Sequence, residues 1–318
     1  MTLLAIHRRA LLRLAGAFAL PAALPAAGQP ATPLLTRKIP SSGELLPVVG
    51  LGSWITFNVG NDQVARNRCA EVLRQFFGGG GKLVDSSPMY GSSQAVIGEA
   101  LERLKPGARL FSADKVWTSS NGPAQLAQSR QLWRVPRFDL LQVHNQLAWQ
   151  EQLPLLFDMK RAGQLRYVGI TTSEGRRHAE VERLMQTYPL DFVQASYNIL
   201  DREVEQRILP LARERGIAVI ANRPFREGQL VDALQKHRLP TWSADIDCAT
   251  WAQFLLKFIV SHPAVTCAIP ATGNPVHVRE NLDAARGRLP DEAMRRQMIA
   301  HVGKLLCPSG GPTASPIS

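Results

Sequence analysis

A strand followed by a helix is the repeating unit of this sequence, and its clearest example begins with LVDSSPMYG, residues 83–91. The stretch begins as a short apolar strand and breaks at its proline and glycine, which leaves Asp85 at the strand end and Tyr90 on the loop beyond. The apolar spacing of residues 94–104 then predicts a helix. A carboxylate and a phenol here can be a strand cap and a packed aromatic side chain, or two members of a site.

The same alternation of strand and helix recurs along the chain. Further apolar strands are predicted at residues 48–52, 110–116, 139–143, 167–170, 192–194, 218–220 and 266–269, each with a helix after it. Eight such units predict a single α/β domain, a parallel (β/α)8 TIM barrel. An open doubly wound sheet is the competing architecture, but no GxGxxG fingerprint follows the first strand. The longest connection, residues 225–247, is expected to lie over the barrel mouth.

The first 28 residues resemble an export signal. They have a basic start, an apolar middle and a Pro/Ala-rich end without an acidic residue, and Arg8-Arg9 resembles the twin-arginine motif. The apolar run is short and is broken at Pro21 and Pro25, so no stable membrane anchor is expected. We therefore predict a signal peptide at 1–28, a linker at 29–38, the barrel at 39–306 and a flexible tail at 307–318, with export by the twin-arginine machinery to the periplasm.

The composition is that of an ordinary globular protein. Of 318 residues, 45% are hydrophobic and 20% are charged, and the formal net charge is +11. The predicted signal contains three arginines and no acidic residue, so its removal lowers the formal net charge from +11 to +8. The basic residues are dispersed, which predicts no nucleic-acid partner. The four cysteines lack the paired spacing of a zinc site, and both disulfides and buried free thiols remain open.

Ionisable residues follow three successive strands. In a barrel the carboxyl ends of the strands meet at one face, so Asp85 and Tyr90, then Lys115, then His144 are expected to converge there. Asp85 and Lys115 are expected to pair, and the Lys115 charge is expected to lower the Tyr90 pKa from its ordinary value of about 10. Tyr90 would then donate a proton to a developing alkoxide, while His144 orients a carbonyl oxygen.

Four blocks of this sequence resemble the aldo/keto reductase family: VGLGSW at 49–54, VDSSPMYG at 84–91, KVW at 115–117 and LLQVHN at 140–145. The resemblance runs from about residue 39 to 285. It implies that Tyr90 is the general acid, that Lys115 and Asp85 tune it, and that His144 orients the carbonyl. It further implies NADPH bound in extended form across the barrel mouth, with hydride passing to a carbonyl carbon of a small-molecule substrate.

The resemblance also implies a set of cofactor contacts. Gln194 matches the residue that binds the nicotinamide amide, and Asn145 and Thr171 are nearby candidates. The adenosine-side pattern is retained by Thr272, Asn274, Glu280 and Asn281.

The chain departs from the family pattern at several cofactor positions. Thr172 replaces an amide-binding Asn, and Asn222 replaces the aromatic residue that stacks on the nicotinamide, a role that Arg223 or Phe225 would have to assume. Basic ligands of the 2′-phosphate are absent at three positions, and each lost charge-assisted bond removes about 1.5–3 kcal/mol. NADH is therefore possible beside NADPH. Those three positions hold Ala271, Gly273 and His277.

Aromatic residues and one unusual acid complete the expected site. Trp54, Trp117 and Trp149 follow the first, third and fourth strands, where they can wall an apolar substrate pocket or pack ordinarily on the rim. Asp114 neighbours Lys115, and strand alternation should point it away from the lysine, toward the helical layer.

Two functions of different class follow from these residues. The first is an exported NAD(P)H-dependent carbonyl reductase or alcohol oxidoreductase. The second is a nicotinamide-binding regulatory protein on the same fold with little or no turnover. A metal-dependent barrel hydrolase is disfavoured, because His144 has no His or Cys at ligand spacing, and no metal site is expected.

Overall fold

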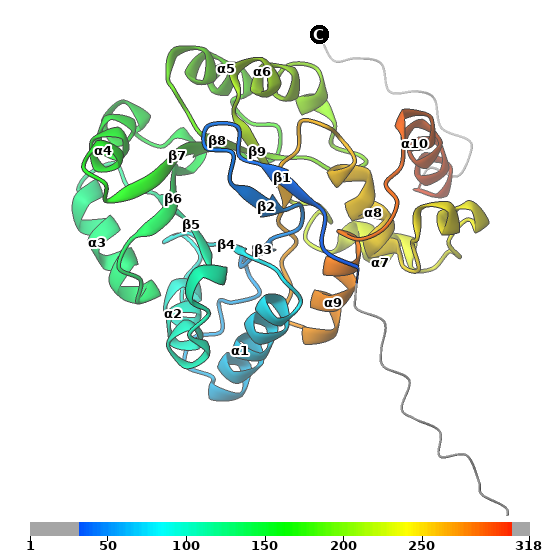
Figure 1. Ribbon diagram of the computed structural model, residues 1–318, viewed down its shortest axis with the longest axis horizontal. Coiled ribbons are helices and arrows are strands. Elements are labelled where there is room, and N and C mark those ends of the chain that lie inside the picture. The colour runs from blue at the N-terminus through cyan, green and yellow to red at the C-terminus, as the bar shows by residue number, and fades with distance from the viewer. Residues whose placement is uncertain (1–31, 307–318) are drawn as a thin grey trace, which may run out of the picture. The chain divides into compact units, whose positions relative to one another are not determined.

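A computed structural model describes residues 32–306, and it contains the predicted barrel as a ring of strands surrounded by helices (Figure 1). Eight parallel strands follow one another in chain order around the sheet. The ring is closed by pairing of Val49 with Ala268 and of Gly52 with Ala271. The strands are β3 (Leu51–Gly52), β4 (Leu83–Asp85), β5 (Phe111–Val116), β6 (Phe138–Val143), β7 (Leu165–Thr171), β8 (Phe192–Ser196), β9 (Ala218–Asn222) and β10 (Cys267–Ala268).

Helices follow the strands as the apolar spacing predicts, and they form the outer ring in Figure 1. Asp62 begins the first of them by accepting hydrogen bonds from the amides of Val64 and Ala65. The helices of this ring are α1 (Gln63–Gly78), α2 (Ser93–Leu104), α3 (Gly122–Trp133), α4 (Trp149–Arg161), α5 (His178–Thr187), α6 (Ile208–Arg215), α8 (Trp251–Val260) and α9 (Pro275–Asp283), and α10 (Glu292–Leu306) follows them.

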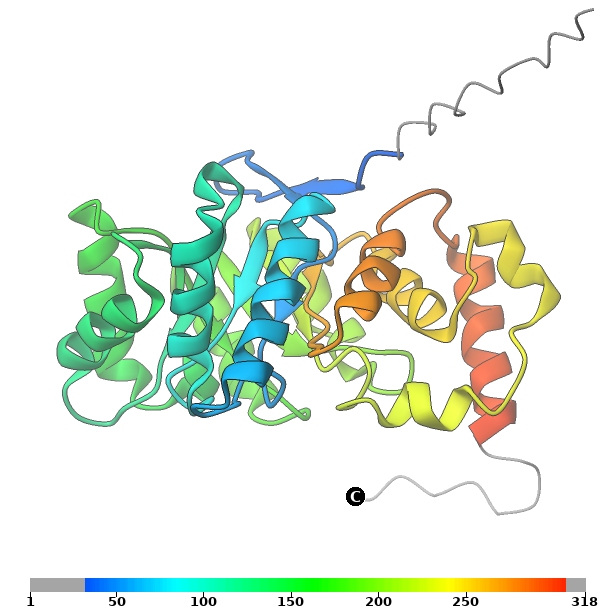
Figure 2. The same cartoon turned by 90° about the horizontal axis from the view of Figure 1, so that it is seen from below.

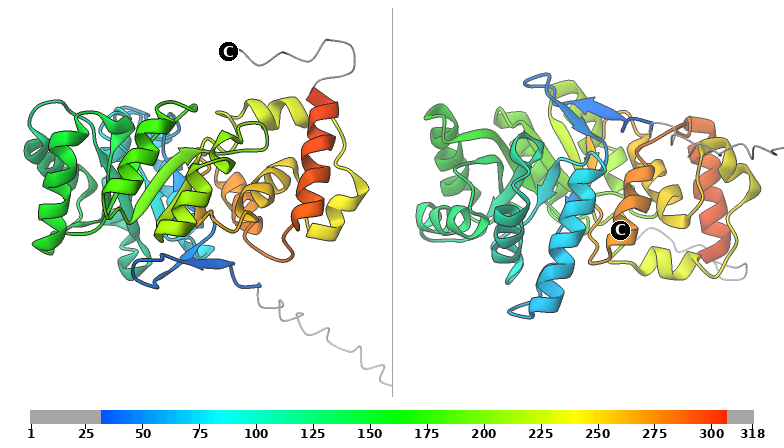
Figure 3. Two further views of the ribbon diagram at one scale, coloured as in Figure 1. Left: turned by 90° about the horizontal axis from the view of Figure 1, so that it is seen from above. Right: turned by 60° about the horizontal axis from the view of Figure 1, so that its bottom comes forward.

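The last three residues of the predicted linker, 36–38, form a strand. Two short antiparallel strands, β1 (Thr36–Lys38) and β2 (Leu45–Pro47), form a hairpin across the amino-terminal end of the barrel, opposite the end that carries α7 (Gln229–Leu234) (Figures 2 and 3). Ile39 and Leu46 are fully buried there and join the apolar cluster inside the barrel. The hairpin thus buries apolar side chains at the open end of the barrel. The periodicity of strands and helices does not predict such a cover.

The long connection after β9 lies only partly over the mouth. Its first part, from Phe225 through α7, lines the cavity described below. Its second part, the 3-10 helix η4 (Thr241–Ile246), packs on the outer helices instead, with the Trp242 ring 5.6 Å from Phe254 and 5.8 Å from His301. The expectation was wrong for this half because its apolar side chains find burial against α8 and α10.

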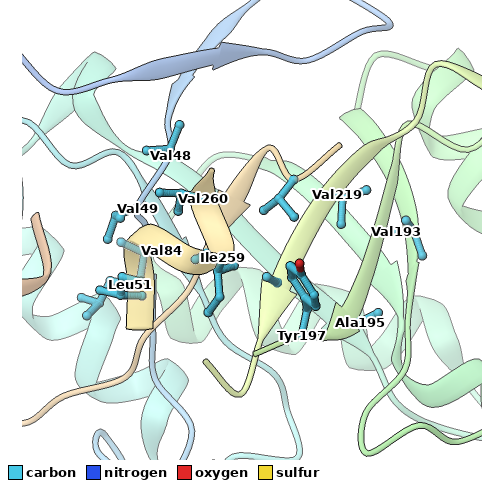
Figure 4. Packing of buried hydrophobic residues seen from close by; sticks show 14 of the residues in the cluster. Val48, Val49, Leu51, Val84, Val193, Ala195, Tyr197, Val219, Ile259 and Val260 are labelled. Carbon is cyan, nitrogen blue, oxygen red and sulfur yellow. The ribbon is translucent and has the colours of Figure 1, made fainter. Parts of the chain in front are cut away.

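Side chains along each strand alternate between the outside and the inside of the barrel. This alternation gives two apolar layers, and it directs polar residues into the barrel mouth. Residues such as Val84, Val193 and Val219 point outward and pack under the helices, together with Ile259 and Val260 of α8 (Figure 4). Their inward neighbours are apolar at the strand starts and polar at the strand ends. The inward polar residues are Asp85, Lys115, Gln142, Thr171, Gln194, Ser196 and Asn222, and they form the floor of the barrel mouth.

The predicted signal at 1–28 and the predicted tail at 307–318 lie outside the described residues. Cys69, Cys248 and Cys267 are free and buried, which excludes a disulfide among these three. Between residues 32 and 306, no helix has both the length and the apolar character needed to span a membrane.

Candidate active site

A buried ion pair forms the base of the site. Lys115 Nζ lies 2.6 Å from Asp85 Oδ2 and donates a second hydrogen bond to the Ser86 carbonyl at 2.9 Å. Both charged side chains are buried, and they come from neighbouring strands, β5 and β4. The same ammonium lies 4.9 Å from the centroid of the Tyr90 ring. The predicted convergence of these three residues is confirmed.

Tyr90 is held as a neutral phenol. Burial raises its pKa, and although the Lys115 charge acts in the lowering direction, it does not overcome the loss of solvation. The prediction of a lowered Tyr90 pKa is therefore wrong in sign. A phenol that keeps its proton at neutral pH is still suited to donate it when negative charge develops beside it.

His144 completes the group in an uncharged state. Its ring lies 5.8 Å from the Tyr90 ring in a T-shaped arrangement, and its Nδ1 is 2.8 Å from Ser87 Oγ. Burial, with a further contribution from the Lys115 charge, lowers the His144 pKa to about 3. Sequence reasoning missed Ser87, which lies two residues after the end of β4 on the loop that leads to Tyr90.

A cavity of about 510 Å³ opens above these side chains at the barrel mouth. The predicted residues that line it are Trp54, Asp85, Tyr90, His144, Asn145, Thr171, Gln194, Arg223, Thr272, Glu280 and Asn281. Sequence reasoning missed several others, including Ile55, Met89, Val231 and Asp232. Ile55 and Met89 lie on loops, and Val231 and Asp232 lie on the short α7, where periodicity gives no signal about side-chain direction.

Four predicted residues are absent from the cavity lining. Lys115 lies below it, under Tyr90. Asn274 begins α9, where its Oδ1 accepts a hydrogen bond from the Val276 amide at 3.0 Å, so its role here is a helix cap. Trp117 is 40% exposed on the loop after β5.

Trp149 is the fourth, and its assignment to the substrate pocket is wrong. Its Nε1 donates to Glu180 of α5 at 2.9 Å, and Arg183 lies 4.9 Å from its ring centroid. The ring also packs edge-on against Tyr188. Because Trp149 follows the fourth predicted strand, we expected it at the rim of the barrel. It is instead the first residue of α4, and its side chain faces α5.

Trp54, by contrast, lies where the sequence predicted. Its ring centroid is 4.9 Å from that of Tyr90, and the residue is 37% exposed at the mouth. Ile55 beside it has a φ of 64°, a left-handed conformation that costs a β-branched residue backbone energy. The apolar side chains of Trp54, Ile55 and Met89 thus form one side of the cavity.

An amide network occupies the position expected for a stacking aromatic residue. Asn222 Nδ2 donates to the Thr172 carbonyl at 3.0 Å and to Gln194 Oε1 at 3.3 Å, while its Oδ1 accepts from Ser196 Oγ at 2.7 Å. Gln194 in turn donates to Asp85 Oδ1 at 3.0 Å. Asn222 therefore contributes hydrogen bonds at this end of the cavity, and through Gln194 it is linked to Asp85.

Arg223 lies at the mouth between two carboxylates. Its guanidinium is 3.0 Å from Glu174 Oε1 and 2.7 Å from Glu227 Oε1. Arg176, also on the cavity wall, pairs with Glu174 as well. Positive charge for a pyrophosphate is present on this wall, but it is already balanced by acidic neighbours.

Asp114 points away from Lys115, as predicted. Its Oδ2 accepts a hydrogen bond from Gln94 of α2 at 2.7 Å, and its Oδ1 is buried without a partner among residues 32–306. Burial raises the Asp114 pKa from 3.8 to about 7. The folded state thus binds this proton more tightly than the unfolded chain does, so the stability it contributes is full below about pH 4 and is lost as pH rises through 7.

Asp114→Asn is expected to remove this pH dependence. Between about pH 5 and 8, the free energy of unfolding of the wild type should fall by about 2–3 kcal/mol relative to the variant. Urea unfolding at the two pH values measures the change, and it is insensitive to any constant cost of the new amide. Parallel stability profiles for the two proteins would contradict the assignment.

No group of three or more potential metal-ligating side chains occurs in the part of the chain that the structure describes. The chemistry that the described residues can perform is proton donation by Tyr90, supported by Lys115 and Asp85, next to the neutral His144.

Comparison with known proteins agrees with this geometry. The model of the aldo/keto reductase family matches residues 48–299. The NADH-specific methylglyoxal reductase of Escherichia coli (strain K12) is 25% identical over 242 residues, which cover 64% of this chain and 72% of that protein. An aldo-keto reductase from Klebsiella pneumoniae in complex with NADPH has a TM-score of 0.71 at 22% identity, over 86% of this chain and 95% of that chain.

A glycerol dehydrogenase from Gluconobacter oxydans shares the fold as well, with a TM-score of 0.65 at 18% identity over 88% of this chain and 99% of that chain. These solved structures confirm the barrel. The family match spans most of the sequence and includes all four residues of the Asp85, Tyr90, Lys115 and His144 group. The chain belongs to the aldo/keto reductase family.

Proposed function

We propose that this protein is an NAD(P)H-dependent reductase of aldehydes or ketones, which can also oxidise the corresponding alcohols. One observation carries the proposal: a neutral Tyr90 stands over the buried Lys115–Asp85 pair and beside an uncharged His144, at the floor of an open cavity. A buried ion pair that served stability alone would not need to lie under a phenol at a cavity floor.

The cavity fits a dinucleotide in its extent and in its polar residues. From Tyr90 and His144 it reaches Thr272, Glu280 and Asn281 on the α9 side. Gln194 and Asn222 place amide groups near Asp85, and the guanidinium groups of Arg176 and Arg223 on the wall can face a pyrophosphate. When bound, the reduced nicotinamide supplies a hydride to the carbonyl carbon.

The residues of this chain would then handle the carbonyl oxygen. His144 lines the cavity and, being neutral, can donate a ring N–H to that oxygen. Tyr90 would give its phenolic proton to the same oxygen as the C–O bond gains negative charge. The Lys115 charge would stabilise the phenolate that remains, and Asp85 holds the lysine in place through the 2.6 Å contact.

The two reduced cofactors are expected to bind with similar affinity. Ala271, Gly273 and His277 offer no Lys or Arg to a 2′-phosphate, and Glu280 adds an acidic group to the lining. Without a charge-assisted bond to that phosphate, the Kd values for NADPH and NADH should differ by less than about tenfold. A fluorescence titration of the mature protein measures both values, after any cofactor retained in purification has been removed.

Two results of this titration would contradict the expected cofactor binding. A preference for NADPH above about a hundredfold would mean that another basic group binds the phosphate. Failure of both nucleotides to bind would contradict the reductase itself.

A regulatory nicotinamide-binding protein is the second candidate. The Asn222 amide network in place of a stacking ring and the carboxylates around Arg223 favour it. Tight cofactor binding with no turnover of any aldehyde tested would support this function over the reductase.

We further propose export to the periplasm by the twin-arginine machinery. The Arg8-Arg9 pair, the apolar run after it and the lack of acidic residues before residue 28 support this proposal. Replacing both arginines by lysine should keep the precursor in the cytoplasm, and unchanged fractionation of that variant would contradict the proposal.

A further inference from the structure

We propose that Ser87 is a positioning residue that fixes the tautomer of His144, so that the imidazole presents an N–H to the substrate oxygen. This inference rests on the proposed reductase function. Ser87 is fully buried on the loop that follows β4, and its Oγ lies 2.8 Å from His144 Nδ1. The contact joins this loop to the 3-10 turn η2 (His144–Gln146), which follows β6.

The direction of the Ser87–His144 hydrogen bond follows from counting protons. Ser87 Oγ already accepts a hydrogen bond from the Met89 amide at 3.2 Å, and a hydroxyl has one proton to donate. Within residues 32–306, His144 Nδ1 is the one side-chain atom that can receive that proton. If Nδ1 carried the hydrogen instead, the buried hydroxyl proton would have no acceptor, which is unfavourable for a group shielded from water.

The His144 ring therefore carries its single proton on Nε2. The ring is neutral, because burial lowers its pKa to about 3, so one nitrogen donates and the other accepts. Nε2 forms no hydrogen bond with the described residues, and it is not among the enclosed polar atoms that lack a partner. Since His144 lines the cavity, its Nε2–H is free to meet a carbonyl oxygen.

The opposite tautomer would turn a lone pair toward that oxygen. Two acceptors facing each other repel, so the carbonyl would lose its orienting bond when charge develops on it. Ser87 prevents this from outside the cavity, since it is not part of the lining. Its backbone also accepts the Tyr90 amide at 2.9 Å, so one residue orients the histidine and holds the turn that carries the tyrosine.

Ser87→Ala tests the inference, because it removes the hydroxyl and leaves the backbone bond to Tyr90 possible. Selective ¹⁵N labelling of histidine reads the tautomer directly from the two ring nitrogen shifts of His144. The wild type should show the Nε2–H form between about pH 5 and 8, and the variant should show a mixture of both forms. We expect kcat/KM for an aldehyde to fall by about tenfold, chiefly in kcat, while the cofactor Kd stays unchanged.

Ser112→Ala is the matched control. Ser112 is equally buried, but it bonds Asp139 at the amino-terminal end of β5, away from the cavity. This variant should lose stability without any change in the His144 ring signals. Ser87→Cys, which keeps a weak donor at the same place, should restore part of the wild-type tautomer ratio.

Three results would overturn the assignment. These are an Nδ1–H form in the wild type, a Ser87→Ala spectrum identical to that of the wild type, and an equal shift of the His144 signals in Ser112→Ala. The NMR reading needs no turnover. If the wild type reduced no aldehyde yet showed the expected tautomer, the reductase would fail while the role of Ser87 in setting the ring would stand.

Discussion

Tyr90→Phe is expected to lower the rate of aldehyde reduction by about 10²–10⁴-fold, the usual contribution of a positioned general acid. The substitution keeps the aromatic ring, so its contacts with Trp54 at 4.9 Å and with the Lys115 ammonium at 4.9 Å can persist. The loss should therefore appear in kcat, with the Kd of the reduced cofactor unchanged. Steady-state kinetics with one aldehyde, together with a cofactor titration of the same preparation, measure both quantities.

Two outcomes of the Tyr90→Phe experiment would contradict its assigned role. A variant that keeps activity within tenfold of the wild type would mean that another group delivers the proton. A variant that loses cofactor binding together with activity would mean that the phenol holds the site open and has no separable chemical role. Trp54→Phe, at the neighbouring aromatic ring, is the matched control and should alter KM more than kcat.

Lys257→Met is expected to cost about 3 kcal/mol or more of folding free energy. Lys257 is fully buried in α8, and its ammonium donates to the carbonyl oxygens of Ile246 at 2.7 Å, Arg286 at 2.7 Å and Arg288 at 2.9 Å. An ammonium has three donors, and all three are used here. Methionine fills a similar volume but leaves these three carbonyl groups, one buried and two partly buried, without the ammonium donors.

The loss should be visible in urea unfolding as a lower midpoint with an unchanged slope. Lys236→Met removes a charge from an exposed position after α7 and should change stability by less than about 0.5 kcal/mol. Equal effects of the two substitutions would show that the Lys257 contacts contribute nothing beyond an exposed lysine. Because Lys257 lies outside the cavity lining, the surviving folded fraction should bind cofactor normally.

The barrel could be predicted from the sequence because its strands are mainly apolar and helices alternate with them regularly. Alternation within a strand also predicted that Asp114 faces the helices while Lys115 faces the barrel interior, as the bond to Gln94 and the pair with Asp85 confirm. The opposite directions of Asp114 and Lys115 follow from the geometry of a strand, in which successive side chains point to opposite faces.

The directions of side chains on loops and the signs of pKa shifts could not be predicted from the sequence pattern. Trp149 follows a strand as Trp54 does, yet its direction is set by partners on α5. The sign of the Tyr90 pKa shift depends on how burial compares with one nearby charge, and a sequence contains neither quantity. Ser87 lies on the loop after β4, where strand alternation gives no direction for a side chain.

The most direct test of the proposed reductase follows the hydride itself. The wild-type protein is mixed, under single-turnover conditions, with an aldehyde and a reduced cofactor that carries deuterium on the transferring face of C4, and the alcohol is analysed by mass spectrometry. A reductase should place one deuterium on the carbinol carbon in the wild type, and Tyr90→Phe should give an alcohol yield lower by about 10²–10⁴-fold at equal time. If the cofactor binds to the wild type and no labelled alcohol forms, the protein is not a reductase, and a regulatory nicotinamide-binding protein describes it better.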